Sequence, residues 1–412
     1  MHIVFATIEF VTEKAGDGGL ANYLAKASQI FAAHGHKVTI VVLSEGNDSF
    51  EYKNNIEVVR VLKDESELSL LFRFINDMEI KRNLSHCWYS YKLNKKIKEI
   101  NRHKKVDIVQ YCHLSALGLF RVKEIPSVVR MSAFDPIDRE THKSEFDLKR
   151  CRVKIGLSDK IDFCALRRAD GVFAPGTFTA TALKKVIGKD ITVLETPTMG
   201  IDLERQMKCL PDCLNGKKYF LFFGTLNNKK GLKVIVQSIY EILKANPQYN
   251  FVLVGKDCGV SMQEGMRTPV VKKMREEARE FQNRIIYFPA MMDRDLLNTI
   301  IYHAELCVLP FRFENLPNTC VEAMELGKIV ISTYKSGISQ MIKEGYNGFL
   351  VEQNNPDALV DKIQKVIALP YEEKRRISEN AIKRTQKMNP DKFYEYMMKY
   401  YQKIILAKNK VL

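Results

Sequence analysis

Two glutamates separated by seven residues, Glu314 and Glu322, have the residue type and the spacing to act on one ligand. The first follows an apolar run that predicts a strand. The second lies in the first turns of a predicted helix, for which Asn318 or Thr319 is the expected N-cap. Free N–H groups at a helix start bind anions, and carboxylates accept hydrogen bonds from hydroxyls. The pattern indicates a nucleotide-sugar; equally open is a structural role, with Glu322 favoured by the helix dipole and Glu314 an ordinary loop charge.

Two glycine-containing loops hold further candidates. In "EKAGDGGLANYL", Gly18 and Gly19 follow the first predicted strand and allow the backbone to approach a ligand closely. A plain tight turn would explain this pair as well. In "GTLNNKKGL", Lys229 and Lys230 place two cations together. We interpret them as phosphate-binding residues, and the alternative is a solvated basic turn.

Polar residues also follow two predicted strands of the N-terminal half. "VDIVQYCHLSALG" contains Cys112 and His113, and "VVRMSAFDP" contains Arg130 and Asp135. In open α/β sheets ligands bind beyond the carboxyl ends of strands, so Arg130 and Asp135 are candidates for contacts with an acceptor. We take His113, with Glu314 and Lys230, as a candidate catalytic residue. One position along a strand decides which face a side chain occupies, so whether Cys112 or His113 faces the site stays open, as does a structural role for His113.

The tripeptide Asp293-Arg294-Asp295 resembles a metal-binding DxD sequence. It precedes the apolar pattern "LLNTII", so we expect an N-cap there and no metal.

These residues need an α/β scaffold to position them. Short β-rich runs alternate with helical patterns, which predicts βαβ units and parallel sheets covered by helices. The alternation restarts after "TMGIDL", so we predict two doubly wound domains, 1–200 and 201–390, that face a cleft, and an amphipathic C-terminal helix over 391–412.

Composition narrows the class of protein. The chain has 412 residues, of which 46% are hydrophobic, so a folded protein of two domains is expected. No window predicts a transmembrane helix, and the N-terminus has no signal-peptide pattern. Nine scattered cysteines favour a reducing cytosol over a disulfide framework or zinc site.

The net charge of +15 predicts an acidic partner. The segment Lys92–Lys105 holds seven Lys or Arg against one Glu, with an apolar stripe at helical spacing. It is either a surface helix packed on the first domain or a peripheral contact with the anionic inner face of a membrane. We expect no nucleic acid, because no nucleic-acid-binding module is apparent.

Several ordered motifs together resemble one family. Glu314-x7-Glu322, "AMELGK", "SGISQMIKEGYNGFLVE", "GTLNNKKGL", "FVLVGKD", "ALRRADGVFAP" and "GGLANYLAKASQIFAAHGHKV" are similar to those of the retaining glycosyltransferases of family 4, which have the GT-B fold. The resemblance spans nearly the whole chain. It implies two tandem Rossmann-like domains, acceptor domain first and donor domain second, with the C-terminal helix returning toward the first.

The resemblance also implies roles for matching residues. Glu314 would contact hydroxyls of the transferred sugar, and Glu322 the ribose. Further contacts with the donor would come from the backbone N–H groups of Leu316, Asn318 and Thr319, and from the side chains of Lys229 and Lys230. Gly19 would lie over the diphosphate, and the backbone at Met292 would contact the nucleobase. Gly18 and Asn22 are candidates for contacts with the acceptor.

Two positions depart from the family pattern. The family commonly places an arginine after the glycine where this chain has Thr225. Thr225 could still donate one hydrogen bond to the diphosphate, and what replaces the arginine stays open. The family histidine, which faces the transferred sugar, would fall one position before His113, at Cys112.

We therefore expect a retaining hexosyltransferase that uses a nucleoside diphosphate sugar, without a metal or other cofactor, to extend a polysaccharide or lipid-linked glycan of the cell envelope. The alternatives are a sugar-nucleotide epimerase of the same fold and a non-catalytic basic binding protein. Donor sugar, base, acceptor, linkage and oligomeric state are not specified.

Overall fold

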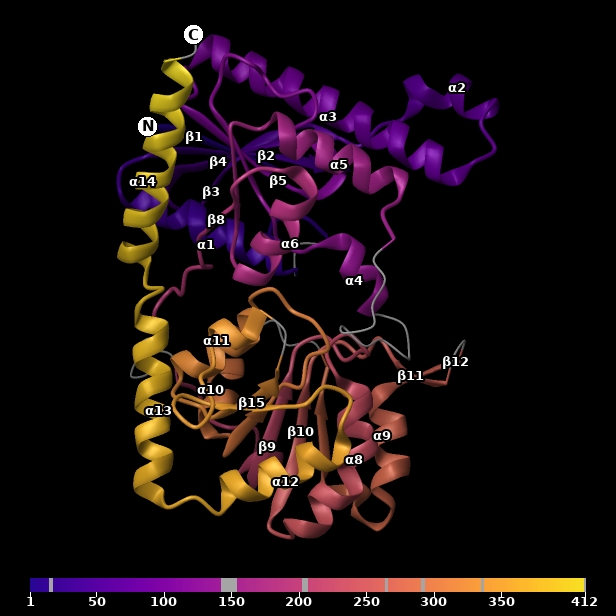
Figure 1. Cartoon of the computed structure of the whole chain (residues 1–412), viewed down its shortest axis with the longest axis vertical. Coiled ribbons are helices and arrows are strands. Elements are labelled where there is room, and N and C mark those ends of the chain that lie inside the picture. Colours follow the sequence, from indigo (N-terminus) through magenta and orange to yellow (C-terminus); the bar gives the residue numbers. More distant parts are fainter. Residues whose placement is uncertain are drawn as a thin grey trace. The chain divides into compact units, whose positions relative to one another are not determined.

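The computed structural model describes residues 1–14, 18–141, 154–201, 207–263, 266–289, 293–334 and 337–410. These residues form two compact units (Figure 1). The first comprises Met1–Pro136, Lys154–Pro197 and the C-terminal segment from Pro390. The second comprises Thr198–Asn389 together with the described residues 137–141.

The first unit is built on a mostly parallel sheet. Among the described residues its strand order is β3-β4-β2-β1-β5-β6-β7-β8, and only β3 runs antiparallel to its neighbour. The strands are β1 (His2–Thr7), β2 (Lys37–Ser44), β3 (Ser49–Tyr52), β4 (Ile56–Leu62), β5 (Ile108–Cys112), β6 (Ser127–Arg130), β7 (Gly171–Ala174) and β8 (Thr192–Val193). The strands β1, β5, β6 and β7 are buried along their whole length, as expected for a parallel sheet covered on both faces.

Helices join and cover these strands. They are α1 (Gly19–Ala33), α2 (Ser69–Arg73), α3 (Met78–His103), α4 (Asp135–Thr141, which crosses into the second unit), α5 (Leu157–Arg168) and α6 (Thr177–Ile187). The C-terminal helix α14 (Pro390–Asn409) also packs here, against α1. Its Tyr401 stacks on Phe31 with ring centroids 5.6 Å apart and donates a hydrogen bond of 2.6 Å to Gln110 Oε1.

The second unit has a fully parallel sheet in the described residues, with order β13-β10-β9-β14-β15-β16. The strands are β9 (Lys218–Phe223), β10 (Tyr249–Val254), β13 (Ile285–Phe288), β14 (Leu306–Val308), β15 (Val330–Thr333) and β16 (Phe349–Val351), and β11 (Val260–Gln263) pairs with β12 (Met266–Thr268) in a separate hairpin. The helices are α8 (Leu232–Ala245), α9 (Val270–Ala278), α10 (Arg294–His303), α11 (Asn318–Glu325), α12 (Pro356–Ile367) and α13 (Tyr371–Gln386). Helix α8 packs with α9 and α12, whereas α11 packs with α13.

The observed architecture confirms the predicted fold class of two Rossmann-like α/β domains. In each unit several buried strands end at the same sheet edge, where the loops carry the candidate residues. No described helix is long and apolar enough to cross a membrane.

Candidate functional site

Glu314 lies in the loop between β14 and α11, and Glu322 lies within α11. Helix α11 begins at Asn318 with Pro317 as its N-cap, and no side chain caps it. The prediction of Asn318 or Thr319 as N-cap was therefore wrong, because Pro317 already provides the extended backbone that precedes the first turn. The Thr319 hydroxyl is buried and has no hydrogen-bond partner among the described residues. An uncapped helix start with an unpaired buried hydroxyl suits an anionic ligand.

Lys230 and Glu314 form the central ion pair of the second unit. Lys230 Nζ lies 2.5 Å from Glu314 Oε1, and the ammonium also lies 5.3 Å from the centroid of the Phe311 ring. Burial raises the pKa of Glu314, but the charges of Lys230 and Lys229 and the Lys230 hydrogen bond outweigh it, so the pKa lies below its ordinary value. Glu314 is therefore ionised at neutral pH and can accept hydrogen bonds.

Two glycines allow the loops around this pair to pack closely. Gly231 ends the lysine loop with φ +80°, and a Cβ there would lie 1.9 Å from the Pro310 carbonyl oxygen. Gly337 donates its N–H to Glu314 O at 2.7 Å, and a Cβ would lie 1.6 Å from Asn315 O. Only glycine fits at either position without a backbone shift.

Glu322 is buried and is held by a residue that sequence reasoning missed as a site component. Arg294 Nη2 lies 2.6 Å from Glu322 Oε1, and the Glu322 side chain is only 10% exposed. Arg294 stands at the first position of α10, between the two aspartates of the DxD tripeptide. The DxD pattern draws attention to its two carboxylates as metal ligands and gives no signal for a role of the cation between them.

Asp293 is the N-cap of α10, as predicted. Its Oδ1 accepts hydrogen bonds from Asp295 N at 3.0 Å and Leu296 N at 3.1 Å. Its other oxygen pairs with Lys208 Nζ. No group of three or more His, Cys, Asp or Glu side chains in the described residues could hold a metal ion.

The other predicted donor residues have varied surroundings. Lys229 pairs with Asp138, on the part of α4 that belongs to the second unit. Thr225 is exposed directly after β9, and Leu316 is buried beside Glu314. Met292 lies outside the described residues.

The glycine loop of the first unit leads into α1. Gly18 is the N-cap of this helix, and Gly19 is its first residue. Asn22 donates from its side chain to Gly18 O at 3.0 Å, so this amide holds the loop. Glu9, which sequence reasoning missed, accepts a hydrogen bond of 3.1 Å from Ala21 N and would lie 2.9 Å from a Cβ on Gly18. A carboxylate therefore already lies at this helix start.

His113 and Cys112 occupy different environments at the end of β5. His113 is buried; its Nδ1 accepts from Ser132 N at 3.3 Å, and its Nε2 lies 3.5 Å from Asp135 Oδ1. Cys112 is buried against the end of β1, where burial raises the pKa of its thiol to about 12. The Cys112 thiol is therefore not set up as a proton acceptor at neutral pH.

Asp162 joins His113 and Asp135 and was also missed from the sequence. Burial, partly offset by His113 and reinforced by Asp135, raises the pKa of Asp162 to about 7. Asp162 lies on α5, far from β5 in the chain, and the alternation of strands and helices gave no signal for this contact. A small cavity beside the group is lined by His113, Asp135, Asp159, Asp162 and four apolar or proline residues.

Arg130 lies in the interior of the first unit at the end of β6. Its guanidinium carbon is 3.7 Å from the centroid of the Tyr23 ring, and Nη2 donates to Thr196 Oγ1 at 3.1 Å. These contacts fix the packing of β6 against α1. An acceptor role for Arg130 stays a prediction.

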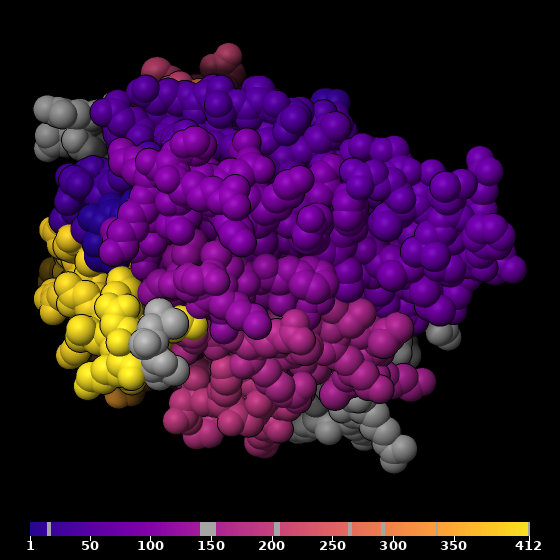
Figure 2. Space-filling view, turned by 90° about the horizontal axis from the view of Figure 1, so that it is seen from above, coloured from indigo at the N-terminus to yellow at the C-terminus, as the bar shows by residue number. Residues whose placement is uncertain are grey.

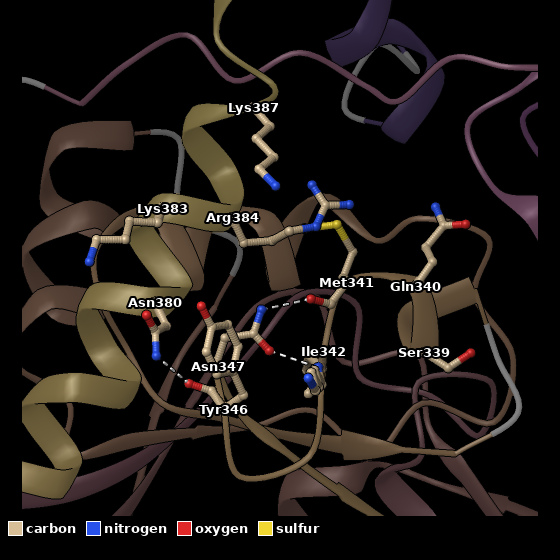
Figure 3. Close-up of a pocket in the computed structure, with 11 residues that line it drawn as sticks. Ser339, Gln340, Met341, Ile342, Tyr346, Asn347, Asn380, Lys383, Arg384 and Lys387 are labelled. Carbon is tan, nitrogen blue, oxygen red and sulfur yellow. Dashed lines mark hydrogen bonds between the residues drawn. The ribbon is translucent and has the colours of Figure 1, made fainter.

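A basic hollow of about 430 Å³ lies elsewhere on the second unit (Figure 3). It is lined on one side by the segment 339–347 and on the other by the end of α13, which contributes Lys383 and Arg384. Asn347 stabilises this segment by donating to Met341 O at 2.9 Å. The hollow contains none of the predicted site residues.

The structure thus brings the predicted residues together in two groups. In the second unit, Lys229 and Lys230 lie close to Glu314, whereas Glu322, on α11, pairs with Arg294. In the first unit, His113 contacts Asp135, whereas Arg130 packs against Tyr23 of α1. The second-unit group offers cations and free N–H groups for an anion beside carboxylates for hydroxyls.

Comparison with known proteins agrees with this chemistry. Residues 213–384 match the family model described as Glycosyl transferases group 1. An uncharacterized glycosyltransferase of Methanocaldococcus jannaschii is 27% identical over 45% of this chain and 48% of its own length. The lipopolysaccharide 1,2-N-acetylglucosaminetransferase of Salmonella typhimurium is 26% identical over 39% of this chain and 42% of its own length. The chain thus spans about half or less of the length of these two relatives.

Solved structures show the same fold over nearly the whole chain. The sucrose-phosphate synthase of Thermosynechococcus elongatus has a TM-score of 0.73 at 17% identity, covering 98% of this chain and 99% of its own. Anabaena HepE, solved with UDP and glucose, has a TM-score of 0.69 at 16% identity, covering 98% and 100%. These likenesses confirm the GT-B fold, and with the family match they support a GT-B glycosyltransferase. Membership of family 4 and the Glu-x7-Glu motif stay predictions.

Proposed function

We propose that this protein transfers a hexosyl group from a nucleoside diphosphate sugar to a hydroxyl of a glycan acceptor, with retention of the anomeric configuration. The observation that carries the proposal is the arrangement around α11. There Lys230 pairs with Glu314 in the loop that precedes α11, and Glu322 lies within α11. No side chain caps the start of this helix, where the buried Thr319 hydroxyl has no hydrogen-bond partner among the described residues.

The donor would bind with its diphosphate at the start of α11. Lys230 and Lys229 supply positive charge, and the N–H groups of Asn318 and Thr319 supply hydrogen bonds. Glu314 would accept hydrogen bonds from the transferred sugar, and Glu322 from the ribose. HepE was solved with UDP and glucose, which supports a nucleotide-sugar as the donor class.

The transfer would proceed on one face of the sugar. The bond between the anomeric carbon and the phosphate oxygen breaks, the bond to the acceptor oxygen forms on the same face, and the acceptor proton passes to the leaving phosphate. The protein would contribute orientation and stabilisation of the charge on the diphosphate. None of these roles calls for a metal ion.

The acceptor would be a polysaccharide or a lipid-linked glycan of the cell envelope. The similarity to the lipopolysaccharide transferase supports a glycan acceptor. Residues of the first unit, with Gly18, Asn22 and Asp135 as candidates, would contact it.

Thermal-shift binding tests the donor site. The full chain is heated with UDP, GDP, ADP and their sugars, with and without EDTA. A ligand at a hundredfold its Kd adds about 2.7 kcal/mol of stability. We expect a shift with one nucleotide that EDTA does not change and that Glu322→Ala abolishes.

The matched control is Glu241→Ala, which removes an exposed glutamate of α8 that is not a site residue. It should retain the full shift. Absence of a shift with every nucleotide would overturn the proposal. Chromatography of the sugar nucleotide tests the alternative. If the donor is isomerised and no sugar is transferred, the protein is an epimerase and not a transferase.

A further inference from the structure

Large apolar side chains are exposed together on α2 and the first turns of α3. Phe74 is 85% exposed, Met78 73% and Leu70 67%, and Leu71 and Ile80 are exposed beside them. All five lie within eleven consecutive residues. Figure 1 shows α2 and the start of α3 projecting from the rest of the first unit, and Figure 2 shows the same purple segment at the protruding edge.

The local structure explains why these residues are not buried. Asp77 caps α3, its Oδ1 accepting from Glu79 N and Ile80 N at 2.7 and 3.1 Å. The buried face of α3 begins only at Asn83 and continues through Leu93 and Ile97. The first turns of α3 therefore extend beyond the core, with α2 beside them.

The outward face of α3 changes from apolar to basic along the helix. Ile80, Leu84, Cys87 and Tyr91 recur at steps of four, three and four residues, and all are exposed or half-buried. The same spacing continues into Lys95, Lys98 and Arg102, all of which are exposed. One stripe thus carries apolar side chains at the projecting end and cations at the other.

Charge on this segment is concentrated. Residues 69–105 contain ten Lys and Arg against three Asp and Glu, a net charge of +7 out of +15 for the whole chain. Of the three acids, Asp77 is occupied in capping α3, and Glu99 pairs with Lys96. The surface therefore complements an anionic partner.

Two aromatic residues, Trp88 and Tyr91, lie where the apolar part of the stripe gives way to the basic part that begins at Lys95. Trp88 stacks on Tyr91 with ring centroids 5.5 Å apart, and its indole N–H donates to Asp64 O at 3.0 Å. Tryptophan and tyrosine favour membrane–water interfaces, because one part of each ring is apolar and another is polar.

We propose that α2 and the first turns of α3, residues 69–80, insert into the surface of an anionic bilayer, with Lys95, Lys98 and Arg102 bound to lipid headgroups. Apolar insertion beside a cationic stripe is the pattern of helices that lie in a membrane interface. The inference deepens the proposed function by naming where a lipid-linked acceptor would be met, but the binding itself does not depend on glycosyl transfer.

Vesicle binding followed by Trp88 fluorescence tests this inference. Trp88 is the only tryptophan of the chain, so its emission reports on this segment alone. The full chain is titrated with vesicles of equal parts phosphatidylcholine and phosphatidylglycerol, and with pure phosphatidylcholine vesicles. We expect a blue shift and binding at least tenfold tighter to the anionic vesicles, weakening as salt is added.

Two triple variants separate the two halves of the surface. Leu70→Ser with Phe74→Ser and Met78→Ser should abolish the blue shift and weaken binding at least tenfold. Lys95→Gln with Lys98→Gln and Arg102→Gln should remove the preference for anionic lipid. Two controls change exposed residues elsewhere on this unit and should bind vesicles as the original chain does. The control for the apolar variant is Phe120→Ser, and the control for the basic variant combines Lys53→Gln, Lys160→Gln and Lys185→Gln.

Undiminished vesicle binding by the apolar triple variant would overturn insertion. Dimerisation that disappears in this variant, without any vesicle binding, would assign the surface to a second copy of the chain instead. The nucleotide thermal shift is measured on every variant. A retained nucleotide shift without vesicle binding rejects only the membrane proposal, whereas vesicle binding without any nucleotide shift rejects only the donor site.

Discussion

At the residue scale, each candidate carboxylate of the second unit is matched by a cation. Glu314 is held by Lys230 and Glu322 by Arg294. A buried carboxylate without a partner would be costly, so these cations compensate and orient both carboxylates when no ligand is bound. The Arg294 side chain is half exposed, so it orients Glu322 from the solvent side.

Arg294 is predicted to position Glu322 for the ribose. Arg294→Ala should raise the KM for the donor several-fold with a smaller change in kcat, because the ribose contact is present before and during reaction. Arg294→Lys should restore part of the loss by restoring the charge. Steady-state kinetics with the donor identified by thermal shift measure this, and an unchanged KM in Arg294→Ala would contradict it.

Asp162 is predicted to make stability depend on pH. Its pKa of about 7 lies above the ordinary value of 3.8, so the folded state binds more protons than the unfolded state between these values. Stability should therefore be greatest in acid and fall as pH rises toward 7, by at most about 1.4 kcal/mol per pH unit for this one group. The groups facing it, His113, Asp135 and Asp159, are left unchanged in the test.

Thermal unfolding of the original chain and of Asp162→Asn from pH 5 to pH 8 provides the measurement. Asparagine cannot ionise, so the variant should gain stability relative to the original chain as pH rises. A constant difference between the two chains across this range would show that Asp162 ionises normally.

At the element scale, helix starts position most of the candidate residues. Helix α11 begins without a side-chain cap, whereas α10 begins with the Asp293 cap. The difference is physical: a capped start has its N–H groups satisfied by the protein, and an uncapped start leaves them for water or a ligand. This contrast favours α11 over the DxD tripeptide as a ligand site.

Asp293 is therefore predicted to stabilise α10 and to take no part in metal binding. Asp293→Ala should lower the melting temperature slightly without a change in donor KM or turnover, and Asp293→Asn should retain the cap and the original stability. Melting curves and kinetics with and without Mg²⁺ or Mn²⁺ test this. A large loss of turnover in Asp293→Ala that added metal rescues would reverse the assignment.

At the scale of the whole molecule, the first unit contains segments from both ends of the chain, and the second unit is formed mainly by the residues between them. Helix α14 follows the second unit in sequence but packs on the first, with Phe393 and Tyr401 against Phe31 of α1 and Ile404 beside Gly171 of β7. Among the described residues, the hydrophobic core of the second unit, in contrast, extends no further than Met388.

Removal of α14 is predicted to destabilise the first unit selectively. A chain ending at Asn389 would expose the Phe31 and Tyr23 side of α1, so calorimetry should show one transition at lower temperature and fluorescent-dye binding should increase. A chain ending at Asn409 is the control and should melt as the full chain does. An unchanged melting profile for the shorter chain would contradict the packing role, and the nucleotide shift reports whether the second unit is intact.

The sequence by itself determined the α/β class, the duplication of the doubly wound pattern and the candidates Glu314, Glu322 and Lys230. The periodicities of strands and helices depend on neighbouring residues, so they can be predicted from the sequence. A motif such as Glu-x7-Glu can also be recognised there, because its two glutamates lie close together in the chain. The Asp293 cap was predicted for the same reason, since a cap acts within one helical turn. The N-cap of α11 was mistaken because Pro317 provides the required backbone without a capping side chain.

Only the tertiary structure decided which residues become partners. Arg294 meets Glu322 across 28 positions, because the parallel sheet brings helix starts from distant segments to one edge. Asp162 of α5 lies beside His113 at the end of β5 because the helix packs on the sheet. Exposure was decided in the same way. Phe74 and Met78 have the residue types of a core, yet they are exposed where no element of the described part of the first unit covers them, and that surface is the basis of the proposed membrane contact.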